Sequence, residues 1–75
     1  MIPAEVCARA AHEVSVVYGR AIGAEVTVWN DLTSPQHYGA IGAAQRIIDG
    51  HAVEPADRGS ALFNAVVRAV AEALR

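Results

Sequence analysis

The sequence has no lysine, and it has only one cysteine, one tryptophan, one phenylalanine and one methionine among its 75 residues. A single cysteine excludes an internal disulfide, and Cys7 is expected to stay reduced. The N-terminus lacks a basic segment and carries Glu5, which is not the pattern of a secretory signal. No apolar run approaches the roughly 18 residues that a spanning helix needs. We therefore expect a soluble cytoplasmic protein without membrane contact.

Positive charge is also scarce. The formal net charge is −2, whereas proteins that bind duplex nucleic acid normally present a basic surface, so that class of partner is not expected. All six basic residues are arginine and sixteen residues are alanine, which is typical of GC-rich coding, as in an actinobacterium or one of its phages. In the phage case the protein would work in the cytoplasm of its host.

Large side chains are few although 53% of the residues are hydrophobic. A chain of this length buries only a little over ~60% of its unfolded surface, and alanine adds little buried area. Thin cores of this kind are often supplemented by disulfides, metal or self-association. The single cysteine and the absence of a Cys/His cluster leave self-association, so a homo-oligomer is expected.

Apolar residues recur at helical spacing in three segments, which predicts an all-α fold. Pro3 suits a first helical turn and Gly23 a C-terminal cap. Ser34 is expected to cap the second helix with Pro35 at its first position, and Pro55 to begin the third. The sequence thus predicts one compact three-helix domain over residues 1–75, with helices at about 3–22, 35–49 and 55–74.

Sequence pattern also predicts which helical faces are covered. The first helix carries an apolar stripe that we expect to form core. Val16 lies outside this stripe, between His12 and Gly19 at helical spacing, and is expected to face outward. In the third helix Asn64 is expected to face water. The stripe of the first helix consists of Val6, Cys7, Ala10, Ala11, Val14, Val17, Tyr18, Ala21 and Ile22.

Two glycines, Gly39 and Gly42, lie inside the second predicted helix, where each costs about 1 kcal/mol relative to alanine. Such glycines usually mark the close approach of another backbone or of a ligand, and packing against the first helix is the simpler explanation. Between these helices, Val26 and Val28 alternate with Thr27 and Trp29. With no second strand candidate in the chain, an extended loop is expected here rather than a strand.

Catalytic and metal-binding patterns are missing. His12, His37 and His51 have no metal-ligand spacing, so no metal and no cofactor are expected. Cys7 lies on the apolar stripe, and no nucleophile has a base placed beside it by sequence. His12 and Glu13 could do acid–base work, but as helical neighbours they point about 100° apart. A non-catalytic protein is the expectation.

Trp29 has two compatible interpretations. In one, the indole folds back over the groove between the first two helices and supplies ring area that alanine lacks. In the other, it is a platform at the mouth of that groove for a nucleobase or similar ring, with Asn30 and Asp31 as hydrogen-bonding neighbours.

Short motifs along residues 6–50 resemble the RyR domain, a small helical module found as repeats in ryanodine receptors and as single proteins in bacteria and phages. They are "ARAAHEV", "AIG", "WND" and "AIGAAQRIIDG". Family members have been associated with recognition of adenine nucleotides and nucleotide signals. The resemblance implies that Trp29 stacks on a base and that His12 and Glu13 line the same groove.

This chain departs from the family at positions that matter for phosphate. Ser15 and Val16 replace a polar pair, and "RGSALFNAVV" stands where the family has a closing His-x-x-Trp element. Arg20 and Arg46 are then the remaining basic candidates near the groove. The candidate ligand-binding residues are Trp29, His12, Glu13, Asn30, Asp31, Arg20 and Arg46.

Two functions of different classes remain open. One is non-catalytic binding of a small nucleotide-type ligand by a homo-oligomer, which in a phage protein would make it a sponge for a host immune signal. The other is a protein-interaction module or inhibitor that docks a host or phage protein. For this second function the candidate contact residues are Val16 and Gly19 on the first helix and Phe63, beside Leu62, on the third.

Overall fold

The computed structural model describes residues 1–75 and contains three α-helices and one short 3₁₀ helix, without strands. This confirms the all-α prediction. Helix α1 spans Ala4–Ala21, with Pro3 at its N-cap and Glu5 in its first turn. Gly23 adopts a φ of 78°, a left-handed conformation that glycine allows without steric cost, and the chain leaves the helix there. The predicted first helix is thus confirmed within one residue at each end.

Helix α2 spans Ser34–Ile48 and has a different cap from the one predicted. Thr33, not Ser34, is the N-cap: its hydroxyl accepts from the Gln36 amide at 3.3 Å, and the Gln36 side chain accepts from the Thr33 amide at 2.8 Å. This reciprocal pair is a capping box, and the glutamine three residues after Thr33 decides between the two hydroxyl residues. At the other end Gly50, with a φ of 86°, ends the helix as expected.

Helix α3 spans Arg58–Ala73, so the predicted start at Pro55 was wrong. Residues 50–57 run as a connection without regular structure, and Asp57 is the N-cap, where its carboxylate accepts from the Ser60 amide at 2.8 Å. Hydrogen bonds from Ser60 lower the pKa of Asp57 below its ordinary value of 3.8. A side-chain cap satisfies an amide that the helix itself leaves free, which Pro55 cannot do.

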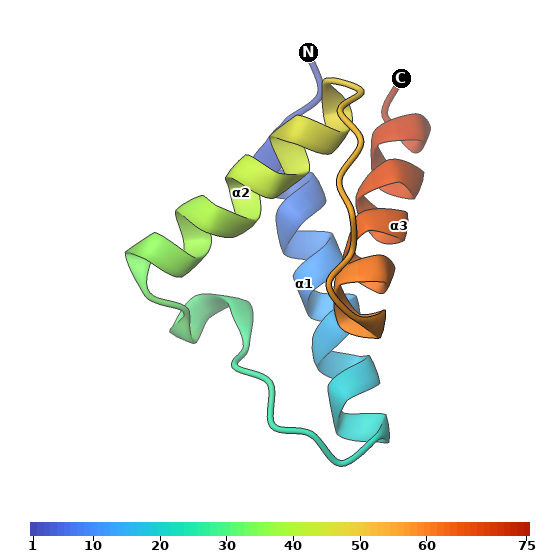
Figure 1. The fold of residues 1–75 in the computed structure, drawn as a ribbon. Helices are drawn as coiled ribbons and strands as arrows, with labels where there is room; N and C mark the ends of the chain where they lie inside the picture. Colours follow the sequence, from blue (N-terminus) through green and yellow to red (C-terminus); the bar gives the residue numbers. More distant parts are fainter.

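The three helices form a small bundle around α1 (Figure 1). Helix α3 runs antiparallel to α1 along one side, and both chain termini lie at the same end of the molecule. Helix α2 crosses α1 obliquely, so its C-terminal half is close to the other helices and its N-terminal half diverges from them. The radius of gyration is 11.7 Å, against about 11 Å expected for a compact chain of this length.

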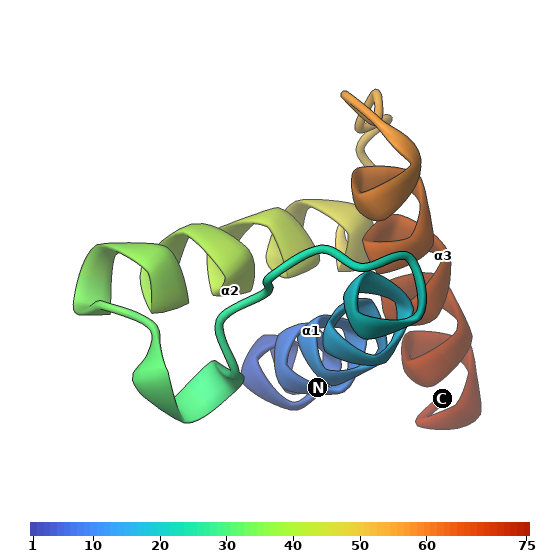
Figure 2. The same ribbon diagram turned by 90° about the horizontal axis from the view of Figure 1, so that it is seen from below.

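After α1, the chain turns back over the helix it has just left (Figure 2). Residues 22–28 are extended and lead into the 3₁₀ helix η1, Trp29–Asp31. The expectation of an extended loop rather than a strand is confirmed. Because this segment returns along α1, it covers a face of the helix that neither α2 nor α3 reaches.

The returning segment overturns the prediction for Val16. Its side chain is only 5% exposed, and it lines a small hollow together with Val28 and Trp29 of the returning segment. Gly19 is buried as well, so close to Val26 that a Cβ atom on the glycine would collide with that side chain. Val16 and Gly19 therefore hold the loop against α1 and cannot form an outward contact surface.

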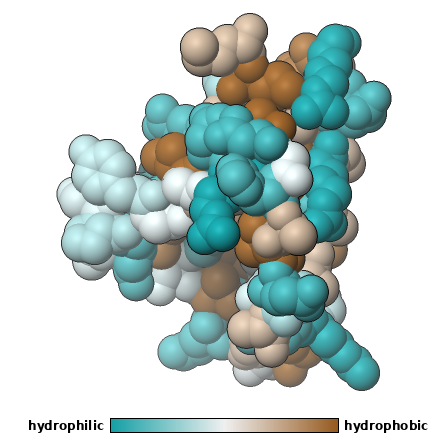
Figure 3. Space-filling view, turned by 45° about the horizontal axis from the view of Figure 1, so that its top comes forward, coloured by the Kyte–Doolittle hydropathy of each residue, from teal (hydrophilic) through white to brown (hydrophobic).

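The hydrophobic core is small: 11 of 75 residues are buried, and eight of them form the core cluster. From α1 the core contains Cys7, Ala8 and Ala11, each 0% exposed, whereas Val16 and Gly19 are buried under the returning segment. Valines of the predicted stripe lie outside it instead, and hydrophobic residues reach the surface in separate patches between hydrophilic ones (Figure 3). The stripe was thus only partly right, because α2 and α3 cover its alanine side.

Asn64 also differs from its prediction. It is 5% exposed and donates through Nδ2 to the Val53 carbonyl oxygen at 3.2 Å. A buried amide needs such a partner, and here it ties the connection between α2 and α3 to α3 itself. The amide faces inward because that connection passes over it.

Candidate functional site

Trp29 lies where the returning loop meets α2, and two histidines flank its ring. The indole is 7% exposed, with the His37 ring edge-on at a centroid distance of 4.6 Å and the His12 ring at 5.9 Å. His37 Nε2 hydrogen-bonds the Trp29 carbonyl oxygen at 2.6 Å, and His12 Nε2 bonds that of Thr27 at 2.5 Å. The two histidines thus fix the loop backbone on both sides of the tryptophan.

Trp29 therefore fills the space between α1 and α2, as its first interpretation expected. Its buried faces leave no room for a base to stack in the usual way, but its edge remains on the surface of a groove. Sequence reasoning missed His37 as its partner. The available signal was the position of His37 in the first turn of α2, which follows the tryptophan loop directly.

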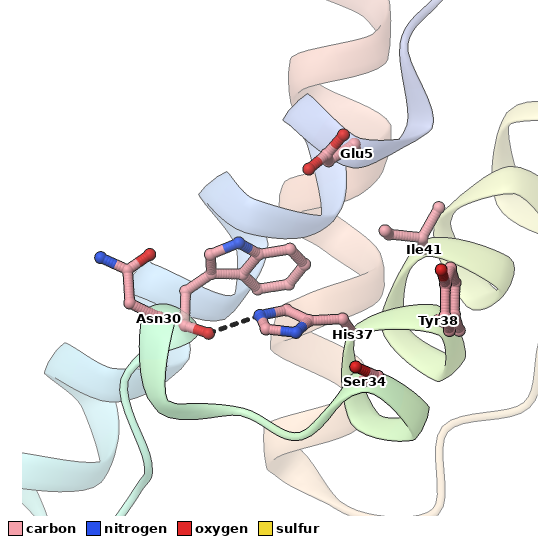
Figure 4. A pocket seen from close by; sticks show the side chains of 7 residues that line it. Glu5, Asn30, Ser34, His37, Tyr38 and Ile41 are labelled. Carbon is pink, nitrogen blue, oxygen red and sulfur yellow. Dashed lines mark hydrogen bonds between the residues drawn. The ribbon is translucent and has the colours of Figure 1, made fainter.

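The groove has a volume of about 470 Å³ and lies between the start of α1, η1 and the start of α2 (Figure 4). This is within the range of about 300–1,000 Å³ usual for small-molecule sites. Glu5 is on α1, Asn30 on η1, and His37 and Tyr38 on α2, so three elements contribute to its walls (Figure 4). The lining residues are Glu5, Trp29, Asn30, Ser34, His37, Tyr38 and Ile41.

Most polar groups around the groove have no hydrogen-bond partner within the protein. This holds for the Glu5 carboxylate, the Asn30 amide and the Tyr38 hydroxyl, and also for the Trp29 indole nitrogen and the Ser34 hydroxyl. The side chain of Tyr38 is 74% exposed. The groove thus combines an apolar floor with donors and acceptors that are free to bind a ligand.

Charge in this groove is negative. Glu5 is the only lining residue with a formal charge at neutral pH, and no arginine is among the residues that line it. Its environment favours a ligand that donates hydrogen bonds or carries positive charge, and disfavours a phosphate.

A smaller hollow of about 240 Å³ lies on the other side of Trp29 and contains Arg20 and Glu13. Trp29 and Asn30 line both spaces, so the two are neighbours. Here the Glu13 carboxylate already pairs with Arg9 at 3.2 Å on the surface of α1. Arg20 has no ion pair within the chain.

The candidate residues from the sequence thus divide into groups. Trp29 and Asn30 lie in the groove, and Glu13 and Arg20 lie in the adjacent hollow. The His12 ring lies tilted beside Trp29, with 5.9 Å between the ring centroids, but its ring nitrogen bonds the loop backbone. Asp31 is exposed and lines neither space, and Arg46 is exposed near the far end of α2.

The contacts predicted for the glycines of α2 and for Phe63 differ from what the structure shows. Gly39 and Gly42 have no atom within 4 Å of the position that a Cβ would take, so they do not pack against α1. The oblique crossing of α2 carries this part of the helix away from α1. Phe63 is half-buried and packs against the core cluster, so only part of its ring is open to a partner.

Cys7 is fully buried, and the loss of contact with water raises the pKa of its thiol. Hydrogen bonding at its own backbone lowers this pKa by a smaller amount.

No group of three or more histidine, cysteine or acidic side chains is arranged to hold a metal ion. No helix is both long enough and apolar enough to cross a membrane.

The chain was compared with family models, curated proteins and solved structures, and it matches none of them. The resemblance to the RyR domain therefore stays a prediction from the sequence.

Proposed function

We propose that the protein binds a small planar ligand with N–H groups, of the nucleobase or nucleoside type, in the groove beside Trp29, without chemical conversion. The observation that carries the proposal is the set of free polar groups around an apolar floor. Glu5 and Asn30 offer acceptors for ring or exocyclic N–H groups, and Tyr38 offers an exposed ring for stacking.

The negative charge of the groove restricts which of the nucleotide-type ligands predicted from the sequence would bind there. A base or nucleoside suits Glu5, whereas a phosphate does not, and Arg20 in the adjacent hollow is the nearest lining arginine. We therefore propose that a phosphate contributes affinity only where the ligand reaches Arg20 past Asn30. In a phage-encoded protein, such binding without chemistry would sequester a host nucleotide signal.

The test is a titration of Trp29 fluorescence with adenine, adenosine, linear adenine nucleotides and cyclic dinucleotides. The chain has one tryptophan, so a saturable change reports the groove directly. Glu5→Gln should weaken binding about tenfold or more, because a charge-assisted hydrogen bond is lost. Glu25→Gln is the matched control, since Glu25 is exposed and lines no hollow.

Arginine variants separate base recognition from phosphate recognition. Arg20→Ala should weaken binding of the nucleotides but not of adenosine, whereas Arg46→Ala should change neither. A flat fluorescence response across the whole panel at millimolar ligand would refute the proposal. So would equal affinity in the wild type and in Glu5→Gln.

The second candidate function is docking of another protein. The surface expected for it from the sequence is not available, because Val16 is buried and Phe63 is partly covered. A different face of α1 is exposed to solvent, however, and the order of its side chains favours one kind of protein partner.

A further inference from the structure

The outer face of α1 carries a row of apolar side chains that are open to solvent except for Ala10, which is half-buried. The three valines of the row are strongly exposed: Val6 by 51%, Val14 by 40% and Val17 by 67%. Ala10 and Ala21 lie between or beyond them at helical spacing. Figure 2 shows α2 and α3 on two sides of α1, with a third side open. We call Val6, Ala10, Val14, Val17 and Ala21 the outer row.

The exposed surface of the whole chain is larger than that of a compact monomer of its mass. The chain exposes 4963 Å², whereas a compact monomer of its mass of 7.9 kDa exposes about 4,400 Å². This surplus of roughly 500 Å² belongs to the whole molecule, including the diverging half of α2. An interface on the outer row would therefore bury less than about 1,000 Å² in total, which is the range of weak, transient contacts. An interface of this size fits a reversible dimer better than a permanent one.

The order of residues in the outer row is self-complementary. When two α1 helices lie antiparallel about a two-fold axis near Val14, Val6 of one copy faces Ala21 of the other. Likewise Ala10 faces Val17, and the two Val14 side chains meet at the axis. Each outer valine then fits against an alanine, and every contact occurs twice, as two-fold symmetry requires.

We propose that a second copy of this chain docks on the outer row and forms an antiparallel two-fold dimer through α1. The small alanines allow the two helices to approach closely, and the valines fill the space between them. At the edge of the row, Arg9 and Glu13 already form an ion pair within each copy, so this edge can remain in solvent without loss of a partner. None of the residues of the outer row lines the groove beside Trp29, and only Val17 also lines the adjacent hollow that contains Arg20.

The first experiment measures mass by sedimentation at concentrations from 1 µM to 1 mM. The wild type should pass from monomer to dimer with a dissociation constant on the order of 10–100 µM. Val17→Glu should raise that constant on the order of a hundredfold, because two unpaired carboxylates would enter the interface. Leu74→Glu is the matched control: Leu74 is 49% exposed but lies at the end of α3. Circular dichroism verifies that both variants remain helical.

Crosslinking tests the geometry. With a short bismaleimide, Val14→Cys should crosslink to itself, and a mixture of Val6→Cys and Ala21→Cys should give the mixed dimer. Val6→Cys alone should not crosslink, since its two copies lie roughly 22 Å apart along the axis at 1.5 Å per residue. The wild type is the control, because Cys7 is fully buried.

A wild type that stays monomeric to 1 mM would overturn the proposal and leave the outer row to a different protein. A dimer that Val17→Glu leaves intact would place the interface elsewhere, and self-crosslinking of Val6→Cys would replace the antiparallel arrangement with another. Ligand titrations of Val14→Glu separate the two proposals. Val14 lines neither the groove nor the hollow that contains Arg20, so loss of the dimer at this position should leave ligand binding within one copy intact.

Discussion

On its inner face α1 carries side chains that are small and fully covered, and on its outer face it carries larger apolar side chains that are open to solvent. Cys7, Ala8 and Ala11 are 0% exposed, whereas Val6 and Val17 are 51% and 67% exposed. Hydrophobicity alone would bury the valines first. The difference shows that the face of α1 that becomes covered is the one that other helices can approach most closely. The two neighbouring helices contact α1 where its side chains are smallest.

The same contrast applies to the glycines. Gly19 is covered by the returning loop at a distance that leaves no space for a Cβ, whereas Gly39 and Gly42 face open space on the diverging half of α2. Similar residues thus have different roles, which depend on what is packed against them. Five experiments can break or sharpen this comparison.

Thiol labelling should give the largest difference between the two faces. In the wild type the only thiol is Cys7 on the inner face, and Val6→Cys in a Cys7→Ala background moves it by one residue to the outer face. Labelling by a maleimide at neutral pH should be on the order of a thousandfold slower for Cys7, because it requires opening of the core. Comparable rates would show that the core around α1 opens readily.

Burial of Cys7 has a consequence for stability against pH. Its pKa is raised above the ordinary value of 9.0 in the folded protein, so the folded state keeps the thiol proton where the unfolded chain releases it. The contribution of the buried, protonated Cys7 thiol to the stability of the fold is full below pH 9.0, and it is lost as the pH rises through the pKa of the thiol in the folded protein. Cys7→Ala should show a smaller loss of stability in alkali than the wild type.

Overpacking of the inner face should give the next largest effect. Ala11→Leu adds three carbon atoms where α1 is fully covered, and should lower the free energy of unfolding by about 3 kcal/mol. Ala69→Leu, at an exposed position of α3, is the matched control and should change it by less than about 0.5 kcal/mol. Urea unfolding measures both. An equal response at the two positions would mean that the inner face is loosely packed.

Gly19→Ala should destabilise the protein by about 1–2 kcal/mol, although alanine is the better helix former. The new methyl group would collide with Val26 and push the returning loop away from α1. Val26→Ala in the same chain should recover part of the loss, which thermal unfolding of the single and double variants can show. A stabilised Gly19→Ala would contradict the close contact between loop and helix.

Gly42→Ala should give the smallest effect and in the opposite direction, a gain of up to about 1 kcal/mol. Nothing lies within 4 Å of its missing Cβ, so only the helix propensity changes. The measurement is again the midpoint of unfolding, with Gly39→Ala as a second case. A loss of stability at both positions would indicate a contact that the isolated chain does not contain, such as a partner on α2.

Much of the fold followed from local signals. Helical spacing, Gly23 and Gly50 predicted α1 and α2 to within one residue, because caps and periodicity depend only on neighbours within about one turn. The errors at Thr33 and Asp57 arose where several residues could cap, and a hydrogen bond to a residue three positions later decided between them.

The candidate site was predictable only in part. The sequence pointed to Trp29 and Asn30, which line the groove, but it placed His12, Asp31 and Arg46 beside them, and these residues have other surroundings. Glu5, His37 and Tyr38 come from two helices that meet only after the chain has folded, so no spacing along the sequence could have brought them together.

By itself the sequence determined that the chain forms three helices, where two of them end, and that its core would be thin. Only the tertiary structure decided which half of the apolar stripe on α1 is covered, that Val16 and Asn64 are buried, and that Trp29 fills the space between α1 and α2. The physical reason is the range of the interactions along the chain. A helix forms through contacts within four residues, whereas burial depends on the path of a loop and on how closely helices that are distant in the sequence approach one another.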